Sequence, residues 1–486
     1  MKMRNILLAS SVLAMVVASG CDSNNDDILI SVKSTEPIQN QSSRSNNYDS
    51  NYLVWEFVHS MSYSYYLWNS NVPLVVDYTQ YDTPFDLFES FRHTDDRFSL
   101  VLDNYTETLS SFSNTYTTDG INYNLYRDKN NSNNIIAVVE YVYDNTPAQK
   151  AGIKRGYVIH KVNDTQLTES NYRELLNLSS CTYTYSVISV DTNDGEPVYS
   201  YGDNLQTSPE VTKAEMEIDP ILNVSTIVKG DKRIGYFLYD SFTDDTKCLM
   251  EVAEKLASQQ ITDLVLDLRL NGGGYINTLD TLASLLVPDG HVGDLFIKEV
   301  YNDNLSEYLR RTEGNDYNKH YFLDLPVKLN INNLYVLTSG NTASASEETI
   351  SGLMPYMPIT LIGNTTYGKF TGNTLINDQD DEGTDENGIP YNEWALYLCV
   401  SSCKNSLNEM NFKNGFTPDY KVAEDYTYEL GNENEPLLAK AIELCTGTIA
   451  KSTVTHPAPL SGYIGAYGKP EIMRSLITQR SLKKLF

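Results

Sequence analysis

The chain has 486 residues, 41% hydrophobic and 21% charged, which predicts large apolar cores and, at about 150 residues each, three domains. Its 36 Lys and Arg stand against 64 Asp and Glu, and the formal net charge of −28, without a basic cluster, disfavours nucleic acid as a partner. The 36 Tyr and the 11% aromatic content exclude extensive disorder, and beyond residue 20 no apolar run reaches the roughly 18 residues of a membrane span.

The N-terminus has the pattern of a cleavable secretory signal. Two basic residues and an apolar stretch at 6–18 precede small residues and then Cys21. This ending resembles the lipobox of bacterial lipoproteins, whose cysteine is acylated and becomes the mature N-terminus; plain secretion is the alternative. The acidic run after Cys21 resembles the export signal of some Bacteroidetes lipoproteins, and a flexible tether explains it equally well. We expect a signal peptide (1–20), then a lipidated cysteine and linker (21–46).

The next segment predicts a small helical module at 47–108. Residues 50–70 carry a dense apolar pattern that is closer to a helix than to a strand. A second helical pattern at 85–91 leads into the polar sequence Asp-Asp-Arg-Phe-Ser at 95–99. We interpret the aromatic residues of this module as core residues.

From about 110 to 205 the pattern changes to short β-strands. Strands are predicted at 135–139, 157–162 and 182–190, and a helix at 171–176. In the segment between the first two strands, Pro147 suits the first turn of a short helix and Gly152 suits its C-cap.

The same stretch resembles a PDZ domain. The shared pattern is Pro-Ala, then Ala-Gly-Ile, then Gly156 before a strand. Tyr157 replaces the usual Asp, and the segment has no clear Gly-Leu-Gly-Phe-like carboxylate loop. The resemblance implies a PDZ-like domain at 109–210, and such domains capture peptides by strand addition.

From about 215 strands and helices alternate, which predicts an α/β core at 211–440. A tail at 441–486, with a basic end at 480–484, follows it. The expected strands are 234–239, 263–268, 334–337 and 359–362, and the expected helices are 245–259, 278–286 and 346–354.

Three short segments in this core could carry chemistry. The glycines that end 267–274 permit positive φ and an anion-binding nest, although taken alone they are better explained by a plain turn from strand to helix. The small residues at 339–347 expose a hydroxyl at a helix N-terminus, where N-capping is the simpler reading. The third segment is Gly-Lys at 368–369, and such a lysine is usually solvated.

Together, the three segments resemble one family, the C-terminal processing (tail-specific) serine peptidases. The shared order is Asp-Leu-Arg-x-Asn-Gly-Gly-Gly, then Thr-Ala-Ser-Ala-Ser-Glu, then Gly-Lys. The sequence Gly-Phe-Thr-Pro-Asp at 415–419 resembles the family's closing motif, and the likeness extends over roughly 110–425. It implies a multi-domain α/β fold with a helical N-terminal module, a PDZ-like β module and a crotonase-like (ClpP-like) catalytic core.

The resemblance also assigns roles to residues. It makes Ser344 the nucleophile, Lys369 the base and Glu347 a third member that orients the lysine, with capping as an alternative role for the glutamate. The spacing of Ser344 and Lys369, 369 − 344 = 25 residues, matches the family. The oxyanion hole would use the N–H of Ala345 and one N–H from the glycine turn, Gly272, Gly273 or Gly274.

The chemistry of such a pair requires a neutral lysine. Burial must therefore lower the lysine pKa from about 10.4 towards the working pH, so that it can take the proton of the serine hydroxyl. Phe370 follows the lysine where many members have Gly, and it either crowds the site or helps to bury Lys369.

No metal or cofactor is expected. The six His form no HExxH motif, and the cysteines form no pair of CxxC motifs. We expect the cysteines after Cys21 to be mostly buried and free: Cys181, Cys248, Cys399, Cys403 and Cys445.

The predicted function is that of a lipid-anchored serine endopeptidase that cleaves near the C-termini of envelope proteins or peptides. Its expected location is the bacterial cell envelope, as an outer-membrane lipoprotein on the periplasmic or the exposed face. Its expected partners are proteins or peptides with exposed C-termini, and the membrane only through the lipid. Two alternatives are a catalytically silent peptide-binding lipoprotein on the same scaffold and, without any paired-carboxylate motif in support, a carbohydrate-handling surface protein.

Overall fold

The computed structural model describes residues 50–105, 108, 115–194, 196–377, 393–447 and 456–469. The predicted signal peptide, Cys21, the linker and the basic end at 480–484 lie outside the described residues. Helices and sheets are both abundant, which confirms the predicted α/β multi-domain class. No helix within the described ranges is long and apolar enough to cross a membrane.

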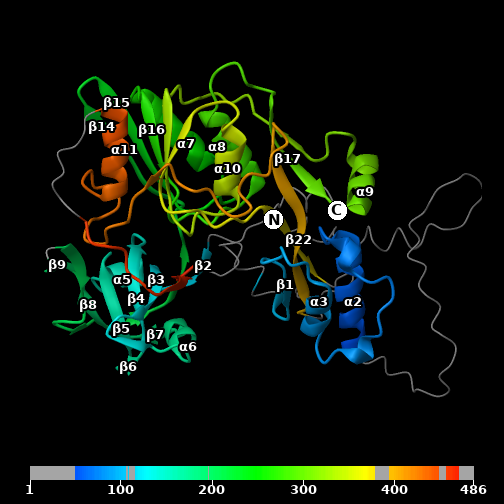
Figure 1. The fold of residues 1–486 in the computed structure, drawn as a ribbon, viewed down its shortest axis with the longest axis horizontal. Coiled ribbons are helices and arrows are strands. Elements are labelled where there is room, and N and C mark those ends of the chain that lie inside the picture. The colour runs from blue at the N-terminus through cyan, green and yellow to red at the C-terminus, as the bar shows by residue number, and fades with distance from the viewer. Residues whose placement is uncertain are drawn as a thin grey trace, which may run out of the picture.

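The centre of the molecule is a six-stranded sheet with helices on both faces (Figure 1). Its elements are β14 (Ile221–Lys229), β15 (Lys232–Tyr239), α7 (Lys247–Ser258), β16 (Asp263–Asp267), α8 (Ile276–Leu286), β19 (Asn333–Thr338), α10 (Ala345–Leu353), β20 (Ile359–Gly363), β23 (Tyr420–Lys421) and α11 (Pro436–Thr446). The strand order is β14–β15–β16–β19–β20–β23, parallel except for β14. Alternate residues of each strand point to opposite faces of the sheet, so the sheet has an apolar core on each face. Helices α7, α8 and α10 pack into one of these cores, and α11 packs into the other.

The helical N-terminal segment packs on a second, antiparallel sheet. The elements of this layer are α2 (Ser50–Tyr65), the short 3₁₀ turns η1 (Asn69–Asn71) and η2 (Tyr78–Gln80), α3 (Pro84–Phe91), β1 (Leu100–Leu102), β17 (Leu295–Tyr301), α9 (Asp303–Glu313), β18 (Lys319–Tyr321), β21 (Thr371–Asn377) and β22 (Ala395–Asn405). Both predicted helices are present, and Thr83 and Asp86 form a capping box at the start of α3. Because β1 pairs with β22, the segment predicted as a module at 47–108 shares its sheet and its core with residues of the predicted α/β core.

A strand-rich module occupies the other end of the molecule. It contains β2 (Thr115–Thr118), β3 (Ile121–Asp128), β4 (Asn131–Val142), α5 (Pro147–Lys150), β5 (Tyr157–Val162), β6 (Thr165–Gln166), α6 (Tyr172–Asn177), β7 (Ser180–Cys181), β8 (Tyr183–Val187), β9 (Ser189–Asn193), β10 (Glu196–Ser200), β11 (Gln206–Thr207), β12 (Val211–Thr212), β13 (Ala214–Glu217) and β24 (Tyr463–Tyr467). Its main sheet has the order β11–β8–β5–β4–β3–β24.

Three features differ from the sequence-based expectations. The strand expected at 182–190 is two strands in different sheets, β8 and β9, separated at the buried Ile188. The boundary expected at residue 440 falls inside α11. The tail expected at 441–486 is not a separate unit in its described part, because β24 pairs with β3 of the strand-rich module.

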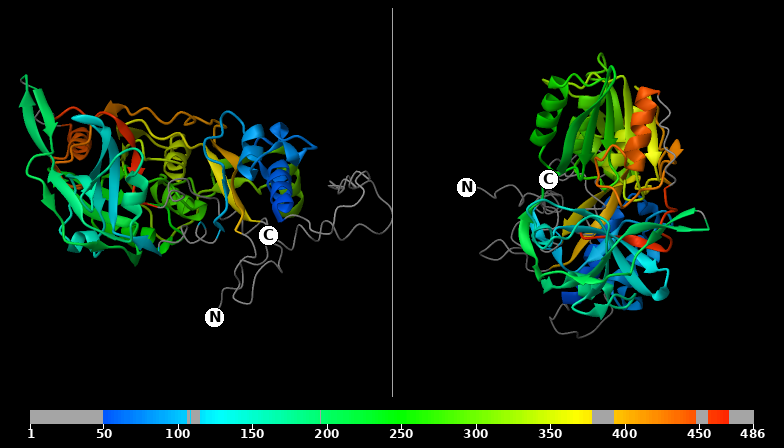
Figure 2. Two further views of the ribbon diagram at one scale, coloured as in Figure 1. Left: turned by 90° about the horizontal axis from the view of Figure 1, so that it is seen from below. Right: turned by 90° about the vertical axis from the view of Figure 1, so that its left-hand side faces the viewer.

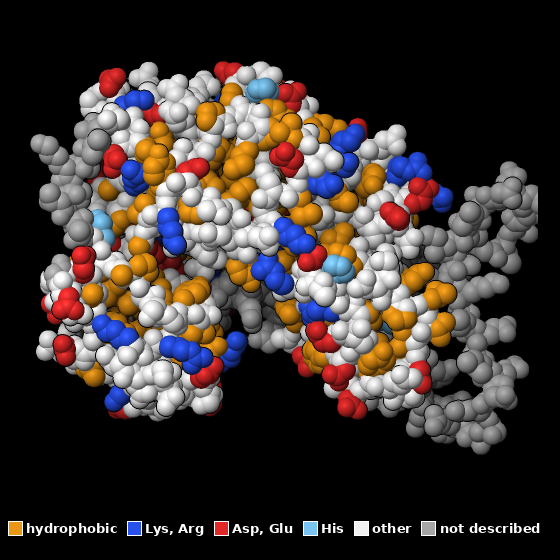
Figure 3. Space-filling view, viewed as in Figure 1, with side chains coloured by type: hydrophobic (Ala, Val, Ile, Leu, Met, Phe, Trp, Pro, Cys, Tyr) orange, Lys and Arg blue, Asp and Glu red, His pale blue; other side chains and the backbone are white. Residues whose placement is uncertain are grey.

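The modules form an elongated molecule with the strand-rich module and the N-terminal helices at opposite ends (Figure 2). The space-filling view shows these two ends as lobes separated by a notch below the central layer (Figure 3). On this face acidic and basic side chains are interspersed, so the acidic surplus forms no single patch there.

Candidate active site

Two loops that carry the predicted motifs meet at one edge of the central sheet. β16 and β19 are parallel neighbours, so the segments that follow Asp267 and Thr338 leave the sheet side by side. The loops are joined directly: the Thr342 hydroxyl donates to the Leu268 carbonyl at 2.9 Å, and the Ala343 N–H donates to the Asn271 carbonyl at 3.1 Å. Binding sites of open α/β sheets lie at this edge.

Ser344 lies at the start of α10 in a strained backbone conformation. Its φ of 55° and ψ of −119° are unusual for a residue with a side chain. A strain of this kind costs on the order of 1–3 kcal/mol and occurs at turns that present a catalytic hydroxyl from a strand to a helix. Ser344 is 4% exposed, and Gly273 lies so close that a Cβ there would be 2.7 Å from the Ser344 Cβ.

One carboxylate, that of Glu347, links Ser344 to the Gly-Lys motif. Its Oε2 accepts the N–H of Ser344 at 3.1 Å and the N–H of Lys369 at 2.8 Å. Its Oε1 accepts the N–H of Gly368 at 2.8 Å and the hydroxyl of Thr366. Burial raises the pKa of Glu347 to about 7, although each of these hydrogen bonds opposes the shift. Glu347 therefore holds the backbones of Ser344 and Lys369 close to each other.

Lys369 is fully buried in an apolar and acidic surrounding. Its Nζ lies 5.8 Å from the centre of the Phe98 ring and 5.6 Å from that of Tyr397. Burial lowers the pKa of Lys369 to about 7, against the opposing influence of nearby acids: Cys399, Glu348, Glu347 and Asp96. A lysine with this pKa is neutral in a large fraction of molecules at neutral pH.

The polar segment 95–99 forms part of this site, which the sequence reading missed. The Arg97 guanidinium donates to the carbonyl of Gly368 at 2.8 Å and so holds the residue before the lysine. Phe98 lies over the lysine, and its carbonyl accepts the side-chain N–H of Asn373. The only sequence feature that could have pointed to this part of the site is the charged cluster Asp-Asp-Arg beside Phe98, directly after a helical segment.

Phe370, which follows Lys369, is buried against the N-terminal segment. Its ring and that of Trp68 form a T-shaped pair at a centroid distance of 6.4 Å, and the Lys413 ammonium lies over its face. It therefore anchors the strand after Lys369 in the core of the N-terminal layer.

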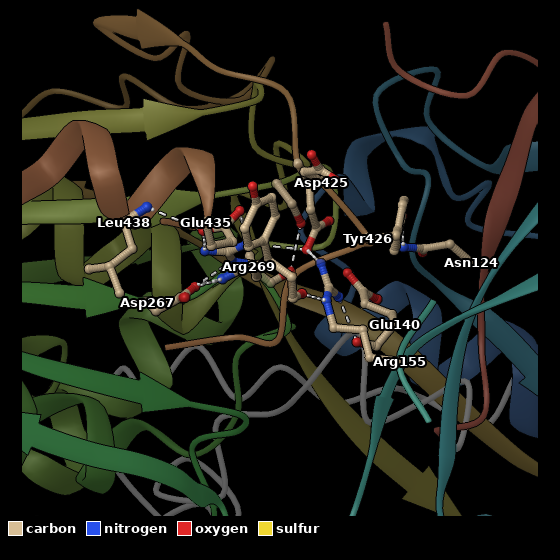
Figure 4. A network of polar contacts seen from close by, with 12 residues as sticks. Asn124, Glu140, Arg155, Asp267, Arg269, Asp425, Tyr426, Glu435 and Leu438 are labelled. Atoms are coloured by element: carbon tan, nitrogen blue, oxygen red, sulfur yellow. Dashed lines mark hydrogen bonds and ion pairs between the residues drawn. The ribbon is translucent and has the colours of Figure 1, made fainter. Parts of the chain in front are cut away.

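Arg269 of the first motif points into the protein and forms the centre of a buried polar network (Figure 4). It pairs with Asp267 at 3.0 Å and with both carboxylate oxygens of Glu435, at 3.0 and 2.9 Å. Glu424 joins it to Arg155 of the strand-rich module, because its Oε1 accepts from both guanidinium groups. The arginine therefore fixes the base of the glycine loop and ties the two modules together.

In the described part of the chain, no group of three or more His, Cys, Asp or Glu side chains could hold a metal ion. The described cysteines are free, and all except Cys248 are buried, which confirms that prediction.

Two family models match the chain: "Peptidase family S41" over residues 233–422 and "Peptidase S41 N-terminal domain" over residues 55–100. A carboxy-terminal-processing protease of Bartonella bacilliformis is 26% identical over 303 residues, 60% of this chain and 59% of the relative. The processing protease CtpA of Bacillus subtilis is 26% identical over 278 residues, 57% of this chain and 51% of the relative. The match therefore spans about half the length of these curated relatives.

A solved structure extends the likeness to the fold. A chain from Bacteroides fragilis assigned to the S41 proteases has a TM-score of 0.65 and 25% identity, over 81% of this chain and 97% of that chain. Residues 233–422 and 55–100 thus match the two models of peptidase family S41, and these matches, together with the carboxy-terminal processing relatives, support a C-terminal processing peptidase.

Proposed function

We propose that the chain is a serine endopeptidase with a Ser344/Lys369 dyad that hydrolyses peptide bonds near the C-termini of envelope proteins or peptides. The observation that carries this proposal is the pairing of a strained, nearly buried serine with a fully buried lysine through the single carboxylate of Glu347. Burying a charged lysine costs several kcal/mol of desolvation, and a lysine without a function would not be expected in such a position. Its position here is explained by the need for a neutral base.

In the proposed reaction, neutral Lys369 takes the proton of the Ser344 hydroxyl as Oγ attacks the carbonyl carbon of the scissile bond. The C–N bond breaks when the resulting lysine ammonium returns a proton to the leaving amine. Water then hydrolyses the acyl-enzyme, with the same lysine as base. Glu347 acts as a positioning residue, because it holds the backbone of both partners.

For the oxyanion hole we propose the N–H groups of Ala345 and Gly274. The N–H of Gly273 already donates to the Asn271 side chain at 2.8 Å. The Gly273 carbonyl accepts the N–H of Phe242, and in a trans peptide the next N–H points the opposite way. The N–H of Gly274 thus points away from Phe242, which leaves it able to donate to the oxyanion. The N–H of Gly272 is the alternative donor.

The remaining assignments are proposals that follow from the sequence. They are a lipid anchor on Cys21, an outer-membrane location on the periplasmic or exposed face, and a PDZ-like role for the strand-rich module. A peptide-binding lipoprotein without turnover is the second candidate, because binding of a peptide by the strand-rich module would not require a competent dyad.

The pH dependence of cleavage tests the proposal. We expect the full chain to cleave an unfolded polypeptide at a rate that rises about tenfold per pH unit well below 7 and levels off above about 8. The reason is that Lys369, with its pKa of about 7 beside Asp96, Glu347, Glu348 and Cys399, becomes neutral as the pH rises. Mass spectrometry of the fragments measures the rate, and circular dichroism shows that the chain stays folded.

Two results would contradict the proposal. A cleavage rate independent of pH between about 5 and 9 would exclude a titrating lysine base. Peptide binding without fragments at any pH would favour the peptide-binding alternative.

A further inference from the structure

The edge of β3 in the strand-rich module is covered by the chain's own C-terminal part. β24 is antiparallel to β3, with Tyr463 opposite Tyr126 and Tyr467 opposite Tyr123. The N–H of Arg127 also donates to the carbonyl of Gly462 at 2.9 Å. The red strand beside the cyan sheet in Figure 1 is this segment. Without it, β3 would be an open edge that accepts another strand.

Side-chain contacts fix β24 against α6 as well. The Tyr467 hydroxyl donates to Asn177 at 2.8 Å and to the carbonyl of Arg173 at 3.4 Å. The Tyr467 ring meets that of Tyr172 edge to face, at a centroid distance of 6.3 Å. β24 therefore fills a groove with a strand on one side and a helix on the other, which is the geometry of peptide capture by strand addition.

The same segment reaches both loops that flank Ser344. The Lys469 ammonium donates to the carbonyl of Leu270 at 2.9 Å and pairs with buried Asp240. The Tyr463 hydroxyl donates to Asn341 at 3.1 Å. β24 thus connects the groove to the glycine loop and to the loop that precedes the serine.

We propose that β24 is the resident ligand of this groove, and that an extended peptide with an aromatic residue in the place of Tyr467 binds there once β24 has left. Only the further step, that such a peptide is a substrate tail, rests on the proposed peptidase function. A chain that continues beyond the aromatic residue needs glycine at the next position. Gly468 has a φ of 107°, and a Cβ there would lie 2.0 Å from the carbonyl oxygen of Ile121.

Two glycines of this segment provide a matched pair of variants. Gly468→Ala places a Cβ against the backbone of Ile121 and is expected to expel β24. Gly465→Ala adds the same atom where nothing lies within 4 Å, so β24 stays in place. Both are made in the full chain with Ser344→Ala, so that cleavage plays no part and a failure of the peptidase proposal cannot be confused with a failure of this one.

The probe is a fluorescent peptide with the sequence of residues 460–469, followed by anisotropy. We expect the Gly468→Ala chain to bind it at least about tenfold more tightly than the parent and the Gly465→Ala chain do. Hydrogen exchange of the β3 amides should be faster in the Gly468→Ala chain and slow again when the peptide is added. Tyr467→Ala, which loses the contacts of β24 with α6, should also bind the probe more tightly than the parent and show faster exchange of the β3 amides.

Equal affinity of all the variants for the probe, or its binding to none of them, would overturn the proposal. Unchanged exchange of β3 in both the Gly468→Ala and the Tyr467→Ala chains would also overturn it, because β24 would then not be the strand that protects this edge.

Discussion

Replacing Ser344 with alanine is expected to lower kcat/KM for peptide cleavage on the order of 10⁴-fold or more, with no loss of folded structure. The substitution removes the attacking oxygen, and a neighbouring hydroxyl does not replace it, because that of Ser346 is bound to Asn271 in the adjacent loop. Cleavage of an unfolded polypeptide, followed by mass spectrometry, measures the loss. Ser351→Ala, on the same helix but bonded to Asn411, is the matched control and should retain activity.

Lys369→Met tests the other half of the dyad. It keeps the length and apolar stem of the side chain and removes only the ammonium, so we expect a similar loss of cleavage. The free energy of unfolding should stay the same or rise, because folding no longer has to desolvate and deprotonate an amine that is buried between Phe98 and Tyr397. Near-parental cleavage by either variant would exclude the Ser344/Lys369 mechanism.

Arg269→Met should produce the largest loss of stability of any single change considered. The arginine is the cation between the buried carboxylates of Asp267 and Glu435, and without it these acids are left unpaired. Breaking a buried pair of this kind costs about 3–5 kcal/mol of unfolding free energy. The loss should appear as a lower midpoint in urea, and peptide cleavage should fall with it, because the glycine loop follows Arg269 directly.

Arg310→Ala is the control for this prediction. Arg310 is an exposed arginine of α9 whose partner Glu307 lies one helical turn away. Pairs of this kind contribute little to stability, so the urea midpoint should not change measurably. A similar midpoint for the two arginine variants would show that the buried network is not what holds the loop.

The secondary structure of the α/β core was predictable because each element carries its own pattern. In α7, Leu249, Val252 and Leu256 recur at helical spacing and are all buried, and β16 reads as a continuous apolar strand because both of its faces are covered. The prediction of a single strand at 182–190 was wrong. All residues of this segment favour β structure, but the chain changes direction at the buried Ile188 and continues in another sheet.

The sequence by itself determined the order of the motifs and therefore the candidates Ser344, Glu347 and Lys369, because the motifs are short and their spacing is read along the chain. Only the tertiary structure decided which groups surround them. Lys369 is buried by Phe98, about 270 residues earlier, and β24 returns to cover a strand more than 300 residues before it. Burial and strand pairing depend on which distant segments pack together, and local propensity does not encode this.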